Sequence, residues 1–415
     1  MQDLNLVALA AREASYALAK CDTETKNKIL AQIAADIVDS SDYILKENAR
    51  DLENAKENGI ATAMLDRLSL SKERIQGIAD GVLDVVKLPD PVGEILESTE
   101  RPNGLKIEKK RVPYGVIGII YEARPNVTVD AAALCLKSSN AVILRGGKEA
   151  ICSNTAFAQV MRSAIEKCGL PADCVTVLSD TSRETATAMM RLNGKIDLLI
   201  PRGGAGLIRS VVENATVPVI ETGTGNCHIY VEKNADLDMA TEILINAKTS
   251  RPSVCNAAES LLVDAAIAKA YLPRAVEALQ AANVEVRGCE KTVEICPQVK
   301  KATDADFYTE YNDYIISVKV VEDLDAAIAH INEHGTKHSE AIVTADAESA
   351  QRFLNEVDAA AVYVNASRRF TDGFEFGFGA EFGISTQKMH ARGPMGLREL
   401  TTHKYLVTGV GQVRK

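Results

Sequence analysis

The feature that most constrains the fold of this chain is an alternation of short apolar segments with amphipathic ones, beginning at Tyr114. The apolar segments are rich in β-branched residues and are bounded by turn-forming residues, which is typical of buried strands. The segments between them have helical spacing. Strands that alternate with helices predict a doubly wound, mostly parallel sheet. The first five predicted strands are GVIGIIY, NAVILRG, CVTVLS, KIDLLIP and VPVIET.

A second series of the same kind follows, with strands such as ESLLVD, SEAIVT and AAVYVN separated by helices. Residues 3–87, by contrast, have only helical periodicity. Because 415 residues exceed what one hydrophobic core usually supports, we expect two α/β domains. The predicted boundaries are 1–96 with 116–226 for the first domain, and 227–385 for the second.

The segment 97–115 departs from this alternation. Asn103-Gly104 is a strong short signal for a β-hairpin, and apolar Leu105 and Ile107 alternate with polar residues after it. Together with a C-terminal segment 386–415 that contains the predicted strand KYLVTG, this ribbon is expected to form an oligomerisation element. An ordinary surface hairpin is the alternative interpretation.

Composition and charge argue against several classes of function. The formal net charge is 47 − 57 = −10, which is unsuited to a general nucleic-acid or membrane-surface role. The N-terminus has no secretory leader pattern, and no apolar run is long enough to cross a bilayer. Nine cysteines, an odd number without CxxC spacing, predict a reducing cytoplasm and neither disulfides nor a metal site. The histidines have no partner pattern and are expected at the surface.

Glycine-rich turns follow three of the predicted strands, at the strand ends where open α/β sheets bind ligands. None matches GxGxxG, but three in one sheet favour a dinucleotide or a similar phosphate ligand. In this interpretation Lys148 contacts a cofactor ribose or 2′-phosphate, and the amides of Gly203 and Gly204 approach a pyrophosphate at a helix N-terminus. The turns are Arg145–Lys148, Arg202–Gly206 and Glu221–Asn226.

Cys255 lies in SRPSVCNAAESLLV, near Arg251 and ahead of an apolar strand, which suits a nucleophilic thiol. It follows Glu221 by 255 − 221 = 34 positions. The order of Asn126, Lys148, Gly203-Gly204, Glu221 and Cys255 resembles that in the aldehyde dehydrogenase superfamily. Within it, the segments GVIGIIYEARPNVTVDAAALCLKSSNAVILRGGKEA, SRPSVCNAAESLLV and FGAEFGISTQKMHARGPMGL resemble the gamma-glutamyl phosphate reductase family, and the resemblance covers nearly the whole chain.

The resemblance implies an aldehyde-dehydrogenase-like fold in which the first domain binds NADP and the second carries the catalytic cysteine. It implies NADPH-dependent reduction of L-glutamyl 5-phosphate to L-glutamate 5-semialdehyde and phosphate, in proline biosynthesis, through a Cys255 thioester. A homo-oligomer and a functional coupling to glutamate 5-kinase are further expectations. The alternatives are a non-phosphorylating, oxidising aldehyde dehydrogenase that releases a free acid, and a catalytically inactive scaffold protein.

The resemblance also assigns roles to residues. Cys255 is expected to be the nucleophile and Asn126 an oxyanion donor. Glu221 has either a catalytic role or a structural or cofactor-binding one, because the turn reads Glu-Thr-Gly-Thr-Gly where the superfamily usually has Glu-Leu-Gly-Gly. Glu310 is expected to hold the nicotinamide ribose, beside Lys148, Gly203 and Gly204 of the cofactor site. The candidates for binding the substrate carboxylate or the phosphate are Arg251, Arg124, Arg368 and Arg369.

Overall fold

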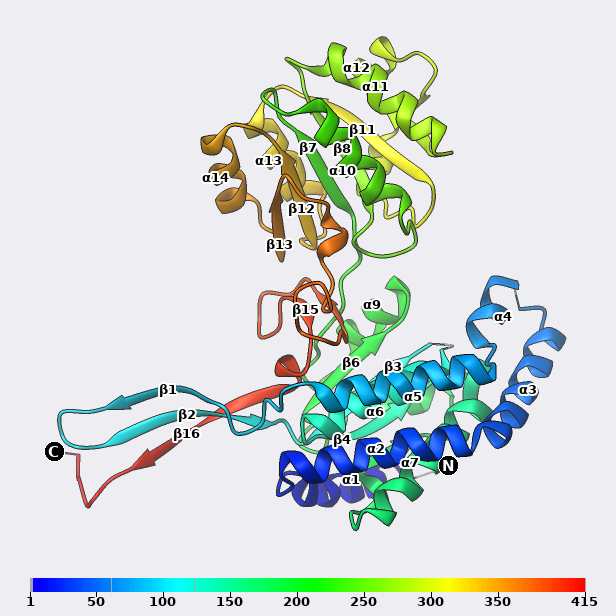
Figure 1. Ribbon diagram of the computed structural model, residues 1–415, viewed down its shortest axis with the longest axis vertical. Helices are drawn as coiled ribbons and strands as arrows, with labels where there is room; N and C mark the ends of the chain where they lie inside the picture. The colour runs from blue at the N-terminus through cyan, green and yellow to red at the C-terminus, as the bar shows by residue number, and fades with distance from the viewer. Residues whose placement is uncertain (1–2, 61, 123, 415) are drawn as a thin grey trace. The chain divides into compact units, whose positions relative to one another are not determined.

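Two parallel sheets organise the chain, one in each of two units (Figure 1). The computed structural model describes residues 3–60, 62–122 and 124–414. Unit 1 comprises Met1–Glu221, Phe378–Phe382 and Met395–Lys415, and unit 2 comprises Thr222–Gly377 and Gly383–Pro394. The second unit therefore begins at 222 rather than at the expected 227. The expected third element, 97–115 with 386–415, is divided, since 97–115 and 395–415 group with unit 1 and 386–394 with unit 2.

Helices make up the first part of unit 1, as their periodicity predicted. Three of them begin at a residue whose side chain accepts a backbone N–H of the first turn, namely Asp3, Asp22 and Ser71. In the second helix the apolar side chains at one-turn spacing are buried. The helices are α1 (Leu4–Leu18), α2 (Thr23–Asp39), α3 (Ser41–Glu57), α4 (Thr62–Leu68) and α5 (Lys72–Lys87).

The unit 1 sheet is parallel, in the order β5-β4-β3-β6. The chain moves outward from β3 to β5 and then returns to place β6 on the other side of β3. The carboxyl ends of β3 and β6 are therefore the switch point at which such sheets bind ligands. The strands are β3 (Val116–Tyr121), β4 (Ala141–Arg145), β5 (Val175–Val177) and β6 (Leu198–Arg202), and the helices between and after them are α6 (Pro125–Lys137), α7 (Ile151–Lys167), α8 (Arg183–Met190) and α9 (Ala205–Asn214).

One predicted strand, VPVIET, does not form in the described part of the chain. Only Val219 pairs, in an isolated bridge with Leu199. Pro218 has no backbone N–H to donate to a neighbouring strand. Its carbonyl alone takes part in the pairing and accepts from the Leu199 amide at 2.8 Å. The prediction of a fifth strand was therefore wrong, because Pro218, and Pro201 on the neighbouring strand β6, have no N–H with which to continue the pairing.

The predicted hairpin is present and belongs to a three-stranded antiparallel sheet of unit 1. Gly104 has a φ of 82°, a left-handed conformation that favours glycine, and it closes the turn by donating to the Arg101 carbonyl at 2.8 Å. Figure 1 shows the ribbon extending away from the helices of its unit. Its strands are β1 (Ile95–Glu100), β2 (Lys106–Pro113) and β16 (Thr401–Thr408).

Unit 2 is built on a parallel sheet of order β10-β9-β11-β8-β7-β12-β13. Successive residues of a strand enter different cores: Leu261 packs with the cluster that includes α10 and α11, whereas Leu262 packs with the cluster that includes α13 and α14. Both faces of this sheet are therefore covered, which is the doubly wound arrangement expected for the second domain.

The strands of unit 2 are β7 (Cys227–Val231), β8 (Ala258–Asp264), β9 (Glu285–Gly288), β10 (Lys300–Lys301), β11 (Ile315–Val321), β12 (Ser339–Val343) and β13 (Ala361–Val364). Its helices are α10 (Leu237–Thr249), α11 (Ala268–Ala281), α12 (Glu290–Ile295), α13 (Leu324–His334) and α14 (Ala347–Glu356). A short pair, β14 (Gly383–Ser385) and β15 (Gly393–Met395), completes the strands.

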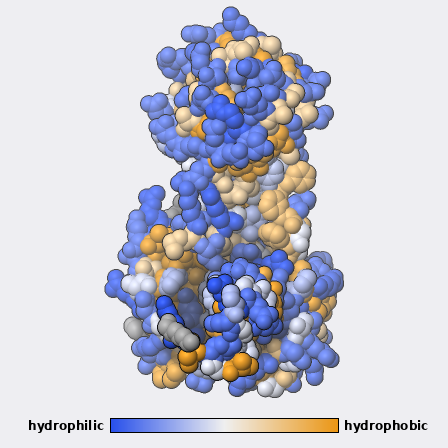
Figure 2. Space-filling view, turned by 90° about the vertical axis from the view of Figure 1, so that its left-hand side faces the viewer, coloured by the Kyte–Doolittle hydropathy of each residue, from blue (hydrophilic) through white to orange (hydrophobic). Residues whose placement is uncertain are grey.

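The face of unit 2 seen in Figure 2 is mainly hydrophilic, as expected where the apolar residues fill the two cores. Across the described residues, no helix combines the length and the apolar character needed to span a bilayer.

Candidate active site

Cys255 lies in the loop 250–257 that joins α10 to β8 in unit 2. Pro252 disfavours the helical conformation at Arg251, which helps to end α10. The loop then closes in a turn in which the Ala257 amide donates to the Val254 carbonyl at 2.9 Å. Cys255 itself is half-buried. A short loop between two regular elements thus presents the thiol in a defined place.

The backbone of Cys255 is held on one side by Gly225. A Cβ atom at Gly225 would lie 1.5 Å from the Cys255 carbonyl oxygen, so only glycine fits there. The Gly225 amide donates to Glu310 Oε1 at 2.7 Å, which brings the residue expected at the nicotinamide ribose next to the nucleophile loop. Within unit 2, Gly225 therefore links the Cys255 loop to Glu310, whose role at the ribose stays a prediction.

A second contact to the same carbonyl comes from Cys227, at the start of β7. Its Sγ donates to the Cys255 carbonyl oxygen, with 3.3 Å between the two atoms. Burial raises the pKa of the Cys227 thiol to about 12, so it keeps its proton and remains a donor. Sequence reasoning did not single out Cys227, because nothing in the pattern distinguishes it from the other buried cysteines.

The turn Glu221–Asn226 owes its glycines to close packing. Gly223 donates to the Ile384 carbonyl at 3.0 Å, and a Cβ on it would lie 2.1 Å from Thr386 Cγ2. Gly225 packs against Cys255 in the same way. The glycines that we interpreted as evidence for a phosphate ligand are thus required by neighbouring parts of unit 2, and the Gly225 amide is already used by Glu310.

Of the adjacent arginines 368 and 369, the second donates hydrogen bonds to the Cys255 loop. Arg369 Nε donates to Ser250 Oγ at 3.0 Å, and its Nη1 donates to the side chain of Asn256. Burial lowers the pKa of Arg369, and so does the positive charge of the nearby Arg251. Two cations, Arg251 on the loop and Arg369 in contact with it, favour an anionic ligand there.

Arg368 is 0% exposed and donates to the Ser339 carbonyl at 3.2 Å. Its predicted direct contact with the substrate disagrees with this burial, so we no longer assign it that role. The two arginines are adjacent in sequence and were predicted to share one role. The 3-10 helix Arg368–Phe370 instead directs their side chains to different partners.

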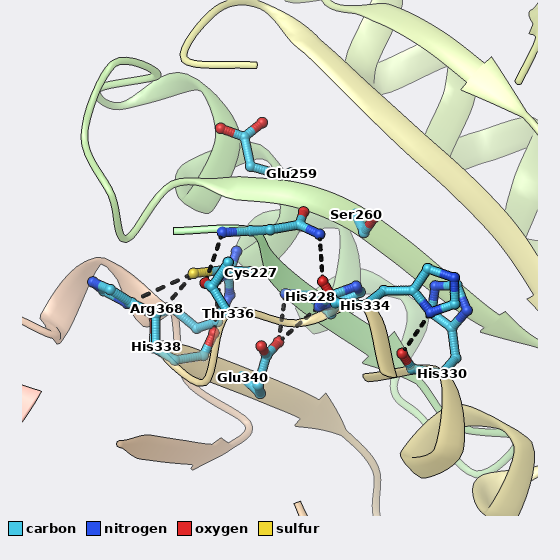
Figure 3. A network of polar contacts seen from close by, with 12 residues as sticks. Cys227, His228, Glu259, Ser260, His330, His334, Thr336, His338, Glu340 and Arg368 are labelled. Carbon is cyan, nitrogen blue, oxygen red and sulfur yellow. Dashed lines mark hydrogen bonds and ion pairs between the residues drawn. The ribbon is translucent and has the colours of Figure 1, made fainter. Parts of the chain in front are cut away.

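Several histidines contradict the expectation that they lie at the surface, whereas His403 is exposed as expected. Four of them gather in unit 2, and His228, His330 and His338 are at most 4% exposed. Figure 3 shows His228 beside Glu340, whose Oε2 accepts the His228 backbone amide at 2.6 Å. His330 stacks on His334 with 3.9 Å between the ring centroids, and burial lowers the pKa of His330 to about 2. The i, i+4 spacing on α13 hinted at this pair, but the strand that supplies His228 is remote in sequence.

In unit 1, Lys148 and the Gly203-Gly204 turn lie at the carboxyl ends of β4 and β6. Lys148 is exposed and begins the 3-10 helix Lys148–Ala150, which suits contact with a phosphate. Gly204 is the N-cap of α9, but its amide already donates to Glu122 Oε2 at 3.1 Å. A carboxylate is stabilised at a helix N-terminus. Glu122, which follows β3, was missed because no motif marks it.

The other predicted residues also belong to unit 1. Asn126 is exposed in the first turn of α6, where its Nδ2 donates to Asp130 Oδ2 at 2.9 Å. Arg124 is the N-cap of that helix, and Glu221 is the last residue of the unit. Their roles at the reacting centre remain predictions, because Cys255 belongs to unit 2. Among residues 3–60, 62–122 and 124–414, no group of three or more His, Cys, Asp or Glu side chains is arranged to hold a metal ion.

Comparison with known proteins shows which families and folds this chain is similar to. The model of the aldehyde dehydrogenase family matches residues 2–315. The gamma-glutamyl phosphate reductase of Caldicellulosiruptor bescii is 61% identical, and the alignment covers 100% of both chains. The crystal structure of gamma-glutamyl phosphate reductase from Thermotoga maritima has a TM-score of 0.99 and 51% identity, with 100% of both chains covered. An acetylating aldehyde dehydrogenase from Geobacillus thermoglucosidasius shares the fold, with a TM-score of 0.69, 18% identity, and 100% of this chain and 98% of that one covered.

Proposed function

Because the chain belongs to the aldehyde dehydrogenase family and, within it, to the gamma-glutamyl phosphate reductases, we propose that it reduces L-glutamyl 5-phosphate to L-glutamate 5-semialdehyde with NADPH. Phosphate is the second product, and the reaction belongs to proline biosynthesis. The observation that carries the proposal is the set of contacts around Cys255: Gly225 packs on its backbone and donates to Glu310, and Arg369 donates to the next residue, Asn256. A half-buried thiol with Arg251 on its loop and Arg369 in contact with that loop suits an anionic, acylating substrate.

In this proposal Cys255 is the nucleophile. Its thiolate attacks the acyl carbon of the substrate, the bond to the phosphate oxygen breaks, and phosphate leaves, so that a thioester remains. NADPH, when bound, supplies the hydride that reduces this thioester. The Cys255 sulfur then leaves as a thiolate and the aldehyde is released. The rigid support of the loop by Gly225 and Cys227 holds the sulfur in place through both steps.

Each tetrahedral species carries a negative oxygen, which needs hydrogen-bond donors. We assign the Asn126 side chain and the Cys255 backbone N–H to this role, on the resemblance. One oxyanion donor is typically worth about 3 kcal/mol of barrier. Asn126 donates to Asp130 in unit 1 as described, so the assignment requires its amide to exchange that partner for the oxyanion.

The residues of the proposed cofactor site fit NADPH at two points. Lys148 presents an exposed ammonium for the 2′-phosphate, and the Glu310 carboxylate lies next to the Cys255 loop, where it would accept from the ribose hydroxyls. The Gly203-Gly204 turn fits less simply. A pyrophosphate there has to displace the Glu122 carboxylate from the Gly204 amide.

Three arginines are proposed to hold the substrate carboxylate and the departing phosphate, namely Arg251 and Arg369 in unit 2 and Arg124 in unit 1. Support for the first two comes from their mutual proximity and from the contacts of Arg369 with Ser250 and Asn256. Arginine suits both groups because its guanidinium binds carboxylate and phosphate in bidentate fashion.

For Glu221 two proposals stand, a catalytic role and a structural or cofactor-binding role. Its half-buried position at the end of unit 1 is compatible with both. The kinetic test is Glu221→Gln, assayed in both directions of the reaction. A rate within a few-fold of the wild type in both directions excludes the catalytic role, whereas a loss of about 100-fold supports it.

We also propose that the protein forms a homo-oligomer, is functionally coupled to glutamate 5-kinase and is located in the cytoplasm. The exposed Tyr405 and Val407 side chains on β16, 59% and 58% exposed, support an association surface. An acyl phosphate hydrolyses readily, which favours coupling to the kinase that makes it. All nine cysteines are free, which suits a reducing compartment.

The decisive experiment is the reverse reaction. NADP reduction with glutamate 5-semialdehyde is measured with and without phosphate, for the wild type and for Cys255→Ser. We expect activity that requires phosphate or arsenate and that falls by at least 1,000-fold in the variant. Equal activity without phosphate would instead favour the oxidising aldehyde dehydrogenase that releases a free acid.

A further inference from the structure

A buried ion pair closes the base of the loop that carries Cys255. Lys248 is the next-to-last residue of α10, and Glu259 is the second residue of β8. Lys248 Nζ and Glu259 Oε2 are 2.7 Å apart, and both side chains are 0% exposed. In Figure 3 the Glu259 carboxylate points away from the contact between His228 and Glu340, so the pair is separate from the histidine cluster.

The other oxygen of Glu259 reaches the loop that carries Glu310. Glu259 Oε1 accepts the Asn312 amide at 3.2 Å, and Asn312 has a φ of 56°, a strained conformation that needs support from its surroundings. Two residues earlier, Glu310 accepts the amide of Gly225, which packs on Cys255. Two hydrogen bonds, the packing of Gly225 on Cys255 and two short chain segments thus link Cys255, Glu259, Asn312, Glu310 and Gly225 in a closed ring.

Keeping two charges in this place is costly. Burial raises the pKa of Glu259 to about 7 even though Lys248 opposes the shift. Buried ion pairs elsewhere have been replaced by apolar side chains of similar volume with little loss, or even a gain, of stability. The stability of the fold therefore does not by itself explain this pair. The need to hold two loops in a defined position does explain it.

We propose that Lys248 and Glu259 are positioning residues that hold the Cys255 loop and the Glu310 loop in one register. The acyl group on Cys255 and the nicotinamide ribose at Glu310 are then correctly placed for the reductive step. Neither residue touches the reacting atoms. The inference rests on the proposed roles of Cys255 and Glu310.

The test compares two double variants that both remove the charges. Lys248→Met with Glu259→Leu keeps the packing but removes the acceptor for the Asn312 amide. Lys248→Gln with Glu259→Gln keeps a neutral hydrogen-bonded pair and an acceptor for that amide. The matched control is Lys26→Met with Asp90→Leu, which removes the buried pair of unit 1, whose side chains are 1% and 8% exposed. The measurements are thermal unfolding, kcat, KM for NADPH, and the rate at which iodoacetamide labels Cys255.

We expect the Met/Leu variant to unfold close to the wild type, to lose at least tenfold in kcat/KM, and to label at Cys255 at a rate changed by at least threefold. The Gln/Gln variant should remain within about threefold of the wild type in both readouts, and so should the control. A folded Met/Leu variant with wild-type activity and labelling overturns the proposal. So does a Gln/Gln variant as impaired as Met/Leu, because the amide contact is then irrelevant.

If the Met/Leu variant does not fold, Lys248→Gln with Glu259→Met takes its place under the same criteria. If that also fails while the control folds, the pair is a determinant of folding and the positioning role is wrong. Labelling of Cys255 needs no substrate, so it tests the geometry even if the reaction proves to be a different one. A wild type without phosphate-dependent activity, by contrast, refutes the proposed function and leaves the labelling result to be judged by itself.

Discussion

The two parts of the proposed site are built on different principles. Around Cys255 in unit 2, a glycine in backbone contact, a buried thiol and a buried ion pair hold the loop. In unit 1, Lys148 and the Gly203-Gly204 turn are exposed, and the Gly204 amide is held by the side chain of Glu122. A nucleophile has to keep its position through several chemical steps, whereas a dissociable cofactor has to enter and leave. The comparison teaches that the first requirement is met by close packing and the second by accessible, exchangeable contacts.

The largest effect is expected where the packing is tightest. In Gly225→Ala the added Cβ would lie 1.5 Å from the Cys255 carbonyl oxygen, and because the backbone fixes the positions of both atoms, no side-chain rotation relieves the clash. We expect kcat/KM to fall by at least about 100-fold, equivalent to about 3 kcal/mol, together with a lower unfolding temperature. The control is Gly77→Ala in α5, where nothing lies within 4 Å of the added atom and activity should be unchanged. A folded, fully active Gly225→Ala enzyme would break the comparison.

Low pH is expected to destabilise the folded state through the buried His330 of unit 2. Burial lowers the pKa of His330 to about 2, so it stays neutral in the folded chain and gains a proton on unfolding. The folded state should therefore lose stability as the pH falls below about 6.5, by about 2 kcal/mol between pH 6.5 and pH 5. In His330→Gln this loss should be smaller, as measured by urea unfolding at the two pH values. His403→Gln, which changes an exposed histidine on β16, should behave as the wild type.

The exposed turns of unit 1 should tolerate substitution and respond in binding rather than in stability. For Lys148→Ala we expect KM for NADPH to rise about tenfold, or about 1.4 kcal/mol, with KM for NADH and the unfolding temperature unchanged. The basis is the loss of an exposed ammonium from the proposed 2′-phosphate site. Equal losses with both cofactors would remove Lys148 from the 2′-phosphate role.

The smallest expected effect is a gain. Glu122→Gln removes a negative charge from the N-terminus of α9, where the pyrophosphate is proposed to displace it from the Gly204 amide. KM for NADPH should fall about threefold because a neutral side chain is easier to displace and does not repel the phosphates. Glu213→Gln, near the other end of α9 and exposed, is the matched control. A higher KM in Glu122→Gln would show that the carboxylate assists binding instead.

Much of the fold was predictable because its signals are local. The alternation of apolar strands and helices identified both parallel sheets, and Asn103-Gly104 identified the hairpin. The prediction of a fifth strand in VPVIET was wrong because Pro218 cannot extend the ladder. Likewise, nothing local distinguishes the environment of Arg368 from that of Arg369, although one is buried and the other contacts the Cys255 loop.

The sequence by itself determined that this chain forms parallel α/β sheets and that Cys255, among nine cysteines, is the candidate nucleophile. Hydrophobic periodicity is sufficient for the first, whereas the second follows from the resemblance of the order of Asn126, Lys148, Glu221 and Cys255 to that of a known family. Only the tertiary structure decided what surrounds Cys255: Gly225 against its backbone, Cys227 on its carbonyl, and Lys248 with Glu259 at the base of its loop. These contacts depend on which strands are neighbours and in what register, and that is set by the packing of segments remote in sequence.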